Sequence, residues 1–173
     1  EIIDDCVGLI NPIADLRGIK IVNEFRKQSP EHLRTDRQRL RQILLNLLTN
    51  AVNYNKDGGT ITISAEKTED SFLRISIADT GIGIAVIDQA SVFQMFHRVG
   101  ANPMMTREGT GIGLTVTKLL VDRMAGRIGF ESEEGVGSTF WIELPLVTND
   151  EVIIWSDTLR VGVDAIDKDH QMI

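Results

Sequence analysis

The chain contains 173 residues, of which 42% are hydrophobic and 25% are charged, as in an ordinary globular domain. That length is enough for one full α/β core with a small appendage. The net charge of −7 argues against a nonspecific nucleic-acid surface, which needs a basic patch, and no apolar run is long enough to span a bilayer. We therefore expect no nucleic-acid partner and no membrane contact by this chain.

The first predicted element is a helix over residues 1–16, which ends near Gly18. The segment GIKIVNEF, residues 18–25, then alternates like a strand. The only cysteine, Cys6, excludes an internal disulfide and fits a reducing compartment; without a flanking base, we interpret it as an apolar core residue. The chain starts without methionine and without a signal-like segment, so we expect a piece of a longer protein.

A second helix is predicted from Asp36, whose carboxylate suits a helix N-terminus, through the sequence RQRLRQILLNLLTNAVNYN. Its apolar residues recur at the spacing of a buried stripe: Leu40, Ile43, Leu44, Leu47, Leu48, Ala51 and Val52. The opposite face carries Arg39, Gln42, Asn46, Asn50 and Asn53. Asparagine is a mediocre helix former, so three of them on one face need a reason. This face either meets water or meets a polar ligand that other segments bring to it.

The segments TITISAEK (residues 60–67) and FLRISIAD (residues 72–79) alternate with many β-branched residues and predict an antiparallel hairpin. Residues 79–113 follow as a long glycine-rich stretch with little periodicity. A structureless segment of this length inside a compact domain tends to be a lid or a binding loop. We therefore expect the chain to bind a ligand there.

Helical spacing returns from Ile112 to Ala125, and Gly126 supplies a stop signal. RIGFESE and GSTFWIELPL, residues 127–133 and 137–146, then predict a second hairpin. Two pairs of strands and three helices predict an α+β fold, a two-layer α/β sandwich with helices on one face of the sheet.

The segment DTGIGI leaves the predicted strand that ends at Asp79. A carboxylate there could accept a hydrogen bond from the exocyclic amine of adenine. Gly81 and Gly83 have no side chains, which lets a flat ring or a backbone approach closely. Ordinary turns use the same residues, so this motif alone does not decide between a turn and a site.

The segment GTGIGL, residues 109–114, runs directly into the predicted third helix. Glycines ahead of a helix leave amide N–H groups free to bind anionic oxygens, and the helix dipole adds a favourable potential. The alternative is a hinge followed by a helix cap. Neither the lysine-bearing phosphate loop nor the dinucleotide fingerprint has this spacing.

These motifs in this order, from an Asn-x-x-x-Asn helix to GST before the last strand, resemble the ATP-binding catalytic domain of sensor histidine kinases. That domain belongs to the superfamily that also contains gyrase, Hsp90 and MutL. NLLTNAVNY resembles the N box of the family, DTGIGI and GTGIGL its two glycine boxes, VFQMFHRV its F box and VGSTF its closing segment. The resemblance covers about residues 1–147 and implies the Bergerat ATP-binding fold, with a mixed, mostly antiparallel sheet.

The resemblance implies ATP and Mg²⁺ as ligands, with Asn50 as the metal ligand and Asn46 and Asn50 as the catalytic residues. Tyr54 would cover the adenine face, Asp79 would bind the adenine amine, and Thr139 would support Asp79 or a bound water. Residues 85–108 would form the lid, with Phe93 and Phe96 at its base. The full set of implied ATP-binding residues is Asn46, Asn50, Tyr54, Asp79, Gly81, Gly83, Ile84, Arg98, Arg107, Gly109, Thr110, Gly111, Gly113, Leu114 and Thr139.

Two positions bear on the activity that the resemblance implies. Relatives that hydrolyse ATP carry a glutamate one turn before the metal asparagine, and Asn46 stands there in this chain. An amide cannot take a proton, which favours transfer to histidine over hydrolysis. The family usually carries a basic residue where this chain has Asn53, so Lys56 or a lid arginine would neutralise the phosphates.

The resemblance implies a protein histidine kinase in two-component signal transduction, with a dimerisation and phosphoacceptor domain and a response regulator as partners. None of His32, His97 and His170 lies in a helix with the acidic neighbour of a phosphoacceptor motif, so we expect this chain not to phosphorylate itself. Residues 1–18 would link a preceding dimerisation domain to a kinase domain over residues 19–147. A cytoplasmic location in a bacterium or archaeon is implied, with a membrane anchor possible elsewhere in the full-length protein.

Residues 148–173 change in character and resemble a linker followed by the start of a bacterial hemerythrin domain, with His170 as its first iron ligand. A di-iron bundle needs ligands from later helices, so this piece alone would bind no iron. The alternatives are a disordered tail or a strand that joins the sheet. For the whole chain, the alternative functions are a degenerate nucleotide-binding regulatory module and a gyrase-type ATPase.

Overall fold

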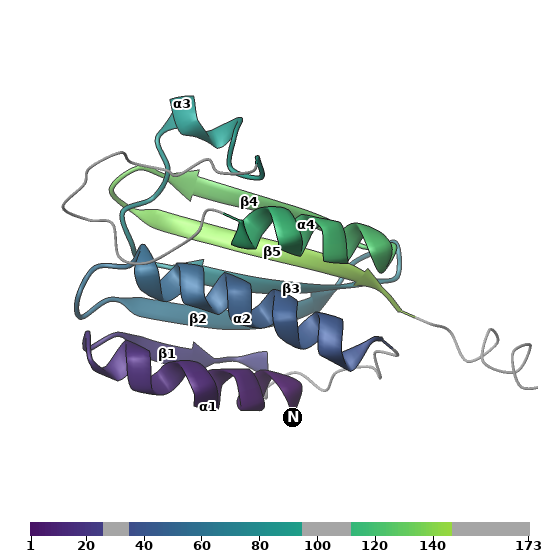
Figure 1. Cartoon of the computed structure of the whole chain (residues 1–173), viewed down its shortest axis with the longest axis horizontal. Helices are drawn as coiled ribbons and strands as arrows, with labels where there is room; N and C mark the ends of the chain where they lie inside the picture. The colour runs from purple at the N-terminus through teal and green to yellow at the C-terminus, as the bar shows by residue number, and fades with distance from the viewer. Residues whose placement is uncertain (26–34, 95–111, 147–173) are drawn as a thin grey trace, which may run out of the picture.

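A computed structural model of the chain describes residues 1–25, 35–94 and 112–146, which form a five-stranded sheet covered by helices (Figure 1). The elements in chain order are α1 (Ile2–Asp15), β1 (Lys20–Asn23), α2 (Arg37–Asn53), β2 (Thr60–Lys67), β3 (Phe72–Asp79), α3 (Val86–Gln89), α4 (Gly113–Arg123), β4 (Arg127–Glu133) and β5 (Gly137–Pro145). The strand order is β1-β2-β3-β5-β4. Among the strand pairs of the described residues, only β1–β2 is parallel, so the sheet is mixed and mostly antiparallel, as predicted.

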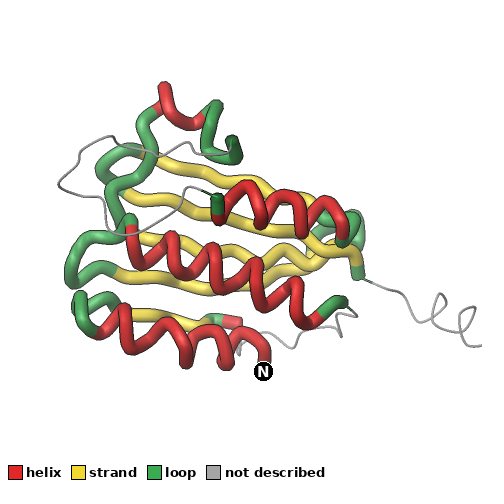
Figure 2. Tube along the Cα trace, viewed as in Figure 1, coloured by secondary structure: helices red, strands yellow, loops and turns green. Residues whose placement is uncertain are grey.

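The helices α1, α2 and α4 lie side by side on one face of the sheet (Figures 1 and 2). All seven apolar residues of the predicted α2 stripe are buried against it. Asp36 caps this helix through its Oδ1, which accepts a hydrogen bond from the backbone N–H of Arg39 at 3.0 Å. The two-layer sandwich predicted from the sequence is therefore the observed fold.

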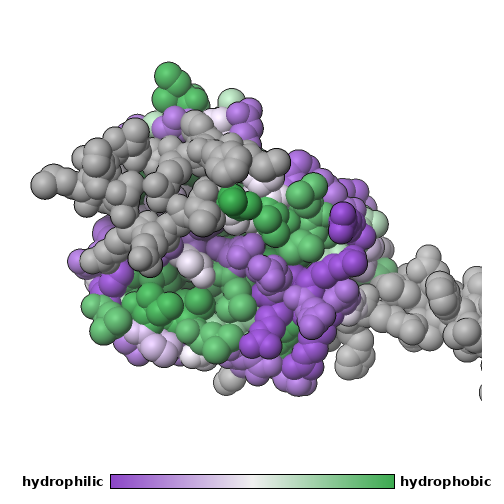
Figure 3. Space-filling view, in the orientation of Figure 1, coloured by the Kyte–Doolittle hydropathy of each residue, from purple (hydrophilic) through white to green (hydrophobic). Residues whose placement is uncertain are grey.

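The helix α1 contributes a second strip of the core, which includes Cys6 with 0% of its surface exposed. Burial raises the pKa of the Cys6 thiol above its ordinary value, which keeps the thiol neutral. Leu9, Ile13 and Leu16 lie on the outer side of the same segment and remain exposed. Figure 3 shows apolar surface gathered over α1 and the adjoining end of α2. Within the described ranges, no helix has the length and apolarity needed to cross a bilayer.

Three details differ from the sequence prediction. The strand β1 ends at Asn23 because the Asn23 side chain turns the backbone, accepting a hydrogen bond from the N–H of Phe25 at 3.1 Å. The helix α3 was not predicted, since one helical turn is too short to show periodicity. After α4, the residue in the left-handed conformation is Ala125, with φ of 53°, and not Gly126.

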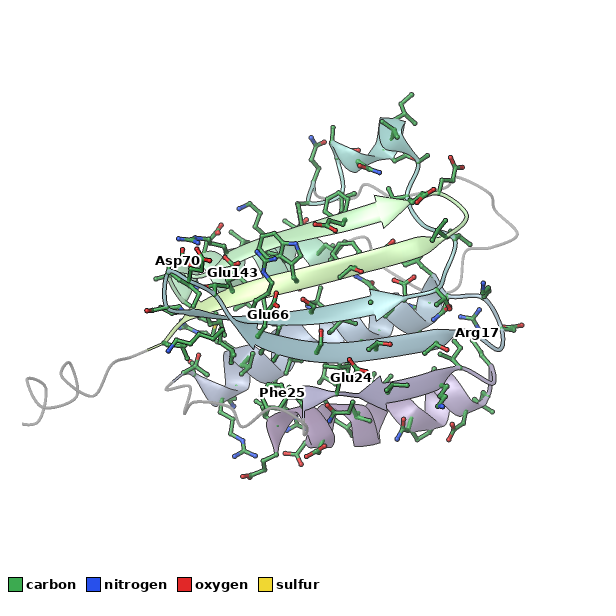
Figure 4. The ribbon with its side chains drawn as sticks, turned by 180° about the vertical axis from the view of Figure 1, so that it is seen from behind. Arg17, Glu24, Phe25, Glu66, Asp70 and Glu143 are labelled. Atoms are coloured by element: carbon green, nitrogen blue, oxygen red, sulfur yellow. The ribbon has the colours of Figure 1, made fainter. Side chains whose placement is uncertain are left out.

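The open face of the sheet, seen from behind in Figure 4, carries charged side chains at the end away from Asp79. The buried carboxylate of Glu143 on β5 accepts hydrogen bonds from Arg74 at 2.6 Å and from Arg127 at 3.3 Å. Arg127 also pairs with Asp70 at 2.6 Å. These pairs fasten the β2–β3 turn to β4 and β5, and so fix the strand register on which the position of Asp79 depends.

Candidate functional site

Three segments meet where β3 ends: the second half of α2, the loop after β3 and the start of α4. The side-chain N–H₂ of Asn46 donates to the carbonyl of Gly113 at 3.3 Å and to the Thr117 hydroxyl at 3.2 Å. At the other end of the same helix, the carbonyl of Tyr54 accepts a hydrogen bond from the N–H of Ile82 at 3.0 Å. The polar face of α2 therefore does not simply meet water, because its first asparagine binds α4.

The carboxyl group of Asp79 lies at the end of β3, beside the loop that follows this strand. In β3 the buried residues Leu73, Ile75 and Ile77 point toward the helices, and alternation places half-buried Asp79 on the same side. Its Oδ1 accepts a hydrogen bond from the N–H of Gly81 at 2.8 Å. Burial raises the pKa of this carboxyl above its ordinary value, while hydrogen bonds from the backbone of Gly81 and of Ser138 act in the opposite direction.

Gly81 shows why this loop needs a residue without a side chain. A Cβ atom at this position would lie 2.1 Å from the carbonyl oxygen of Tyr54 and 2.7 Å from the Asp79 Oδ1. Both distances are far below van der Waals contact. The close approach that the sequence predicted is thus made by the backbone of α2 itself.

The rest of the DTGIGI loop is fastened to the turn between β4 and β5. Gly135 donates its N–H to the carbonyl of Ile82 at 2.7 Å, and buried Ile84 donates its own to the Ser132 hydroxyl at 2.8 Å. Gln89 of α3 donates to the carbonyls of Ile84 and Ser132 at 3.0 and 3.2 Å. The loop is therefore an ordered wall of the site.

Thr139 does not lie beside Asp79. The strand register pairs Thr139 with Ala78 and pairs Ser138 with Asp79, and paired residues share a face of the sheet. Ser138 is buried on the helix side, where its hydroxyl lies 2.8 Å from that of Ser132. Ser138, and not Thr139, is therefore the residue of β5 that contacts Asp79, while the alternative role of Thr139, to support a bound water, stays a prediction. The sequence indicated this orientation, because the alternating apolar residues Phe140, Ile142 and Leu144 place Ser138 on the same face of the strand.

Four of the remaining predicted residues belong to α2 or α4 or directly follow α2. Asn50 is half-buried one turn after Asn46, and Tyr54 is 41% exposed at the C-terminal end of α2. Gly113 and Leu114 are the first residues of α4, where no side chain of the described residues caps the helix. Five predicted residues lie outside the described residues: Arg98, Arg107, Gly109, Thr110 and Gly111.

The base of the predicted lid is partly described. Phe93 packs edge-on against Phe130 of β4, with ring centroids 5.8 Å apart, and its carbonyl accepts a hydrogen bond from the Thr115 hydroxyl at 3.1 Å. Phe96 lies outside the described residues. Among the described side chains, no group of three His, Cys, Asp or Glu residues could hold a metal ion.

The fold has helices on one face of a mixed sheet, and the polar groups described above gather where β3 ends. The chain belongs to the family described as histidine kinase-, DNA gyrase B- and HSP90-like ATPases, whose model matches residues 35–148. The chain is 39% identical over 150 residues to the sensor histidine kinase GacS of Pseudomonas protegens, covering 84% of this chain and 16% of the relative. It therefore spans about a sixth of that protein.

Solved structures of histidine kinases share the fold. Full-length ShkA in complex with AMPPNP matches with a TM-score of 0.73 and 32% identity, over 85% of this chain and 30% of that one. Histidine kinase ThkA in complex with the response regulator TrrA matches with a TM-score of 0.66 and 23% identity, over 85% of this chain and 40% of that one.

Proposed function

We propose that this chain binds ATP with Mg²⁺ and donates the γ-phosphoryl group to a histidine on a separate dimerisation domain, in two-component signal transduction. The observation that carries the proposal is the half-buried carboxyl of Asp79, set between α2 and the DTGIGI loop on the helix side of the sheet. Membership in the family and the AMPPNP complex of ShkA support it.

At the adenine end, Asp79 accepts a hydrogen bond from the exocyclic amine, because a carboxylate can accept further donors beside the Gly81 N–H that its Oδ1 already binds. Ser138 supports this carboxyl from the paired position on β5. Tyr54 covers the face of the ring, and its partial exposure leaves the aromatic surface open to a ligand. Gly81, Gly83 and Ile84 form the wall against which the base lies.

At the phosphate end, Asn46 of α2 contacts Gly113 in the first turn of α4, and Asn50 lies one turn further along α2. We propose that Arg98, Arg107, Gly109, Thr110 and Gly111, which lie outside the described residues, also bind the phosphates. The half-buried amide of Asn50 fits a hard cation, since its oxygen is the kind of ligand that Mg²⁺ prefers. When bound, Mg²⁺ would neutralise phosphate charge.

The position of Asn46 favours phosphoryl transfer over hydrolysis. Its amide donates to the carbonyl of Gly113 and to the Thr117 hydroxyl, and an amide cannot accept a proton from water. The gyrase-type ATPase is the less favoured alternative for this reason. The other alternative, a degenerate regulatory module, would bind nucleotide without transferring phosphate.

Replacing Asn50 by alanine is expected to remove the Mg²⁺ dependence of ATP binding. Calorimetric titrations with and without Mg²⁺ give two dissociation constants, whose ratio should approach unity in this variant. Gln42→Ala is the matched control, because it removes an exposed amide two turns earlier on the same helix. An Asn50→Ala protein that kept the full Mg²⁺ effect would show that the ion is held elsewhere.

The activity itself is tested by incubating the chain with γ-labelled ATP and a separately purified dimerisation domain. Label should appear on that domain and not on this chain, and little free phosphate should form. Stable label on the chain would contradict the expectation that it cannot phosphorylate itself. Binding without transfer would indicate the regulatory module, and rapid phosphate release would indicate an ATPase.

We propose the domain organisation predicted from the sequence: residues 1–18, whose helix α1 packs into the core, link a preceding dimerisation domain to the kinase domain over residues 19–147, and residues 148–173 form a separate segment. The partners are then the dimerisation domain and a response regulator, as the ThkA complex with TrrA illustrates for that protein. A cytoplasmic site of action follows from these partners.

The segment 148–173 lies outside the described residues. Its resemblance to the start of a bacterial hemerythrin domain, with His170 as the first ligand, supports a di-iron domain that continues beyond Ile173 in the full-length protein. Expression of a longer chain that includes the following helices should give the absorption of an oxo-bridged di-iron centre. A longer chain that folds without binding iron would remove this part of the proposal.

A further inference from the structure

Arg17, in the turn between α1 and β1, binds the C-terminal end of α2 through all sides of its guanidinium group. Nη1 donates to the carbonyl of Val52, and Nη2 donates to the carbonyl of Asn55 at 2.6 Å. Nε donates to the Asp57 carboxylate at 2.8 Å. Carbonyls at a helix C-terminus lack partners within the helix and carry the negative end of its dipole. A planar cation with several fixed donors suits them.

The backbone of the same turn is fastened to the turn after α2. The carbonyl of Arg17 accepts a hydrogen bond from the N–H of Gly58 at 2.9 Å, and Lys20 donates its N–H to the carbonyl of Gly59 at 2.9 Å. Only 15% of the Arg17 side chain is exposed. Figure 4 shows Arg17 at one end of the sheet, opposite the end that carries Asp70 and Glu143. This is the end at which β3 finishes.

The residues that Arg17 holds are next to those that hold the DTGIGI loop. Tyr54 lies between the two carbonyls that bind the guanidinium, and its own carbonyl accepts the N–H of Ile82. The buried Asn55 side chain accepts a hydrogen bond from the Thr80 hydroxyl at 3.3 Å. Thr80 and Ile82 flank Gly81, whose N–H binds Asp79. The contacts form one continuous chain from the end of α1 to Asp79.

We infer that Arg17 is a positioning residue for the nucleotide site, and that it couples the end of α1 to nucleotide affinity. It fixes the backbone around Tyr54, which in turn fixes the loop that presents Asp79. The inference rests on the proposed function, because it assigns the adenine end of the site to Tyr54 and Asp79. The ion pair with Asp57 contributes little, since that carboxylate is 76% exposed and water screens it.

The test compares Arg17→Met, Arg17→Lys and Asp57→Asn with the unchanged chain. Methionine keeps the apolar stem, and lysine keeps the charge but lacks the planar fork that spans two carbonyls. ATP affinity should fall by about fivefold or more in Arg17→Met and less in Arg17→Lys. Asp57→Asn should bind ATP as the unchanged chain does, because both carbonyl contacts of Arg17 remain. Affinities are measured well below the unfolding temperature of each variant.

A second readout separates positioning from loss of stability. Tyr54 is the only tyrosine in the chain, so incorporation of 3-fluorotyrosine gives a single ¹⁹F resonance that reports its surroundings. This resonance should shift in nucleotide-free Arg17→Met and Arg17→Lys but not in Asp57→Asn. If Arg17→Met does not fold, Arg17→Lys decides the question.

An unchanged ¹⁹F resonance in the Arg17 variants, or a shifted resonance with unchanged ATP affinity, would overturn the inference. If the unchanged chain binds no ATP, the proposed function is wrong, whatever the Arg17 variants show. The ¹⁹F shift would then still establish whether Arg17 positions Tyr54, so the two failures can be told apart.

Discussion

Replacing Asp79 by asparagine is expected to weaken ADP and ATP binding by about 10- to 150-fold, the loss of about 1.5–3 kcal/mol that a charged hydrogen bond contributes. The Oδ1 of this residue is already engaged by the N–H of Gly81 at 2.8 Å. If the asparagine oxygen keeps that contact, its N–H₂ group faces the adenine amine, and two donors oppose each other. Calorimetric titration with ADP measures the change. Asp122→Asn, on the exposed side of α4, is the control.

The same substitution is not expected to destabilise the fold. Burial raises the pKa of the Asp79 carboxyl, which means that the folded state favours the protonated form. The raised pKa of Asp79 therefore stabilises the wild-type fold at a pH below the ordinary carboxyl pKa. This contribution to the free energy of unfolding is lost as the pH rises through the raised value. Thermal unfolding at pH 3 and pH 7 should show Asp79→Asn gaining stability relative to wild type at the higher pH. An Asn variant that keeps its ADP affinity would show that Asp79 does not bind the base.

Replacing Gly83 by alanine is expected to destabilise the domain by about 2–5 kcal/mol and to displace the loop that carries Asp79. Gly83 has a φ of 66°, and a Cβ atom there would lie 2.0 Å from the carbonyl oxygen of Glu133. The backbone of the β4–β5 turn would have to move, which breaks the wall of the site. Urea unfolding measures the stability, and ADP titration measures the effect on the site.

Gly135 provides a matched control for this experiment. Its φ is 81°, and a Cβ atom there would meet no other atom within 4 Å. Gly135→Ala should therefore lower the free energy of unfolding by only about 1–2 kcal/mol, the cost of placing a residue with a side chain in the left-handed conformation. Equal losses in the two variants would mean that the turn yields easily, and that Gly83 does not hold the loop in place.

Much of the fold could be predicted because local patterns determine it. The apolar spacing of α2, the Asp36 cap and the alternating strands each depend on neighbours in sequence, and the structure confirms them. Asp79 could be located because it is the last residue of such a strand. The helix α3 could not be predicted, since four residues show no period.

What remained hidden depends on partners that are distant in sequence. That Ser138, and not Thr139, lies opposite Asp79 follows from the register between β3 and β5, which lie about sixty residues apart in the sequence. Arg17 reads as an ordinary surface residue in the sequence, because its acceptors are backbone carbonyls of α2. No side-chain pattern marks a carbonyl as an acceptor. The contact is visible only in three dimensions.

The parallel pairing of β1 with β2 has a consequence for where the folding unit begins. The family match starts at residue 35, yet α1 and β1 precede it and bury Ile3, Cys6, Ile10, Ala14 and Ile19 in the shared core. In a chain trimmed to that match, β2 would become an unpaired edge strand, and the face of α2 that packs against α1 would be exposed to solvent. Such an unpaired edge invites self-association, so the trimmed protein should precipitate where the intact one stays in solution.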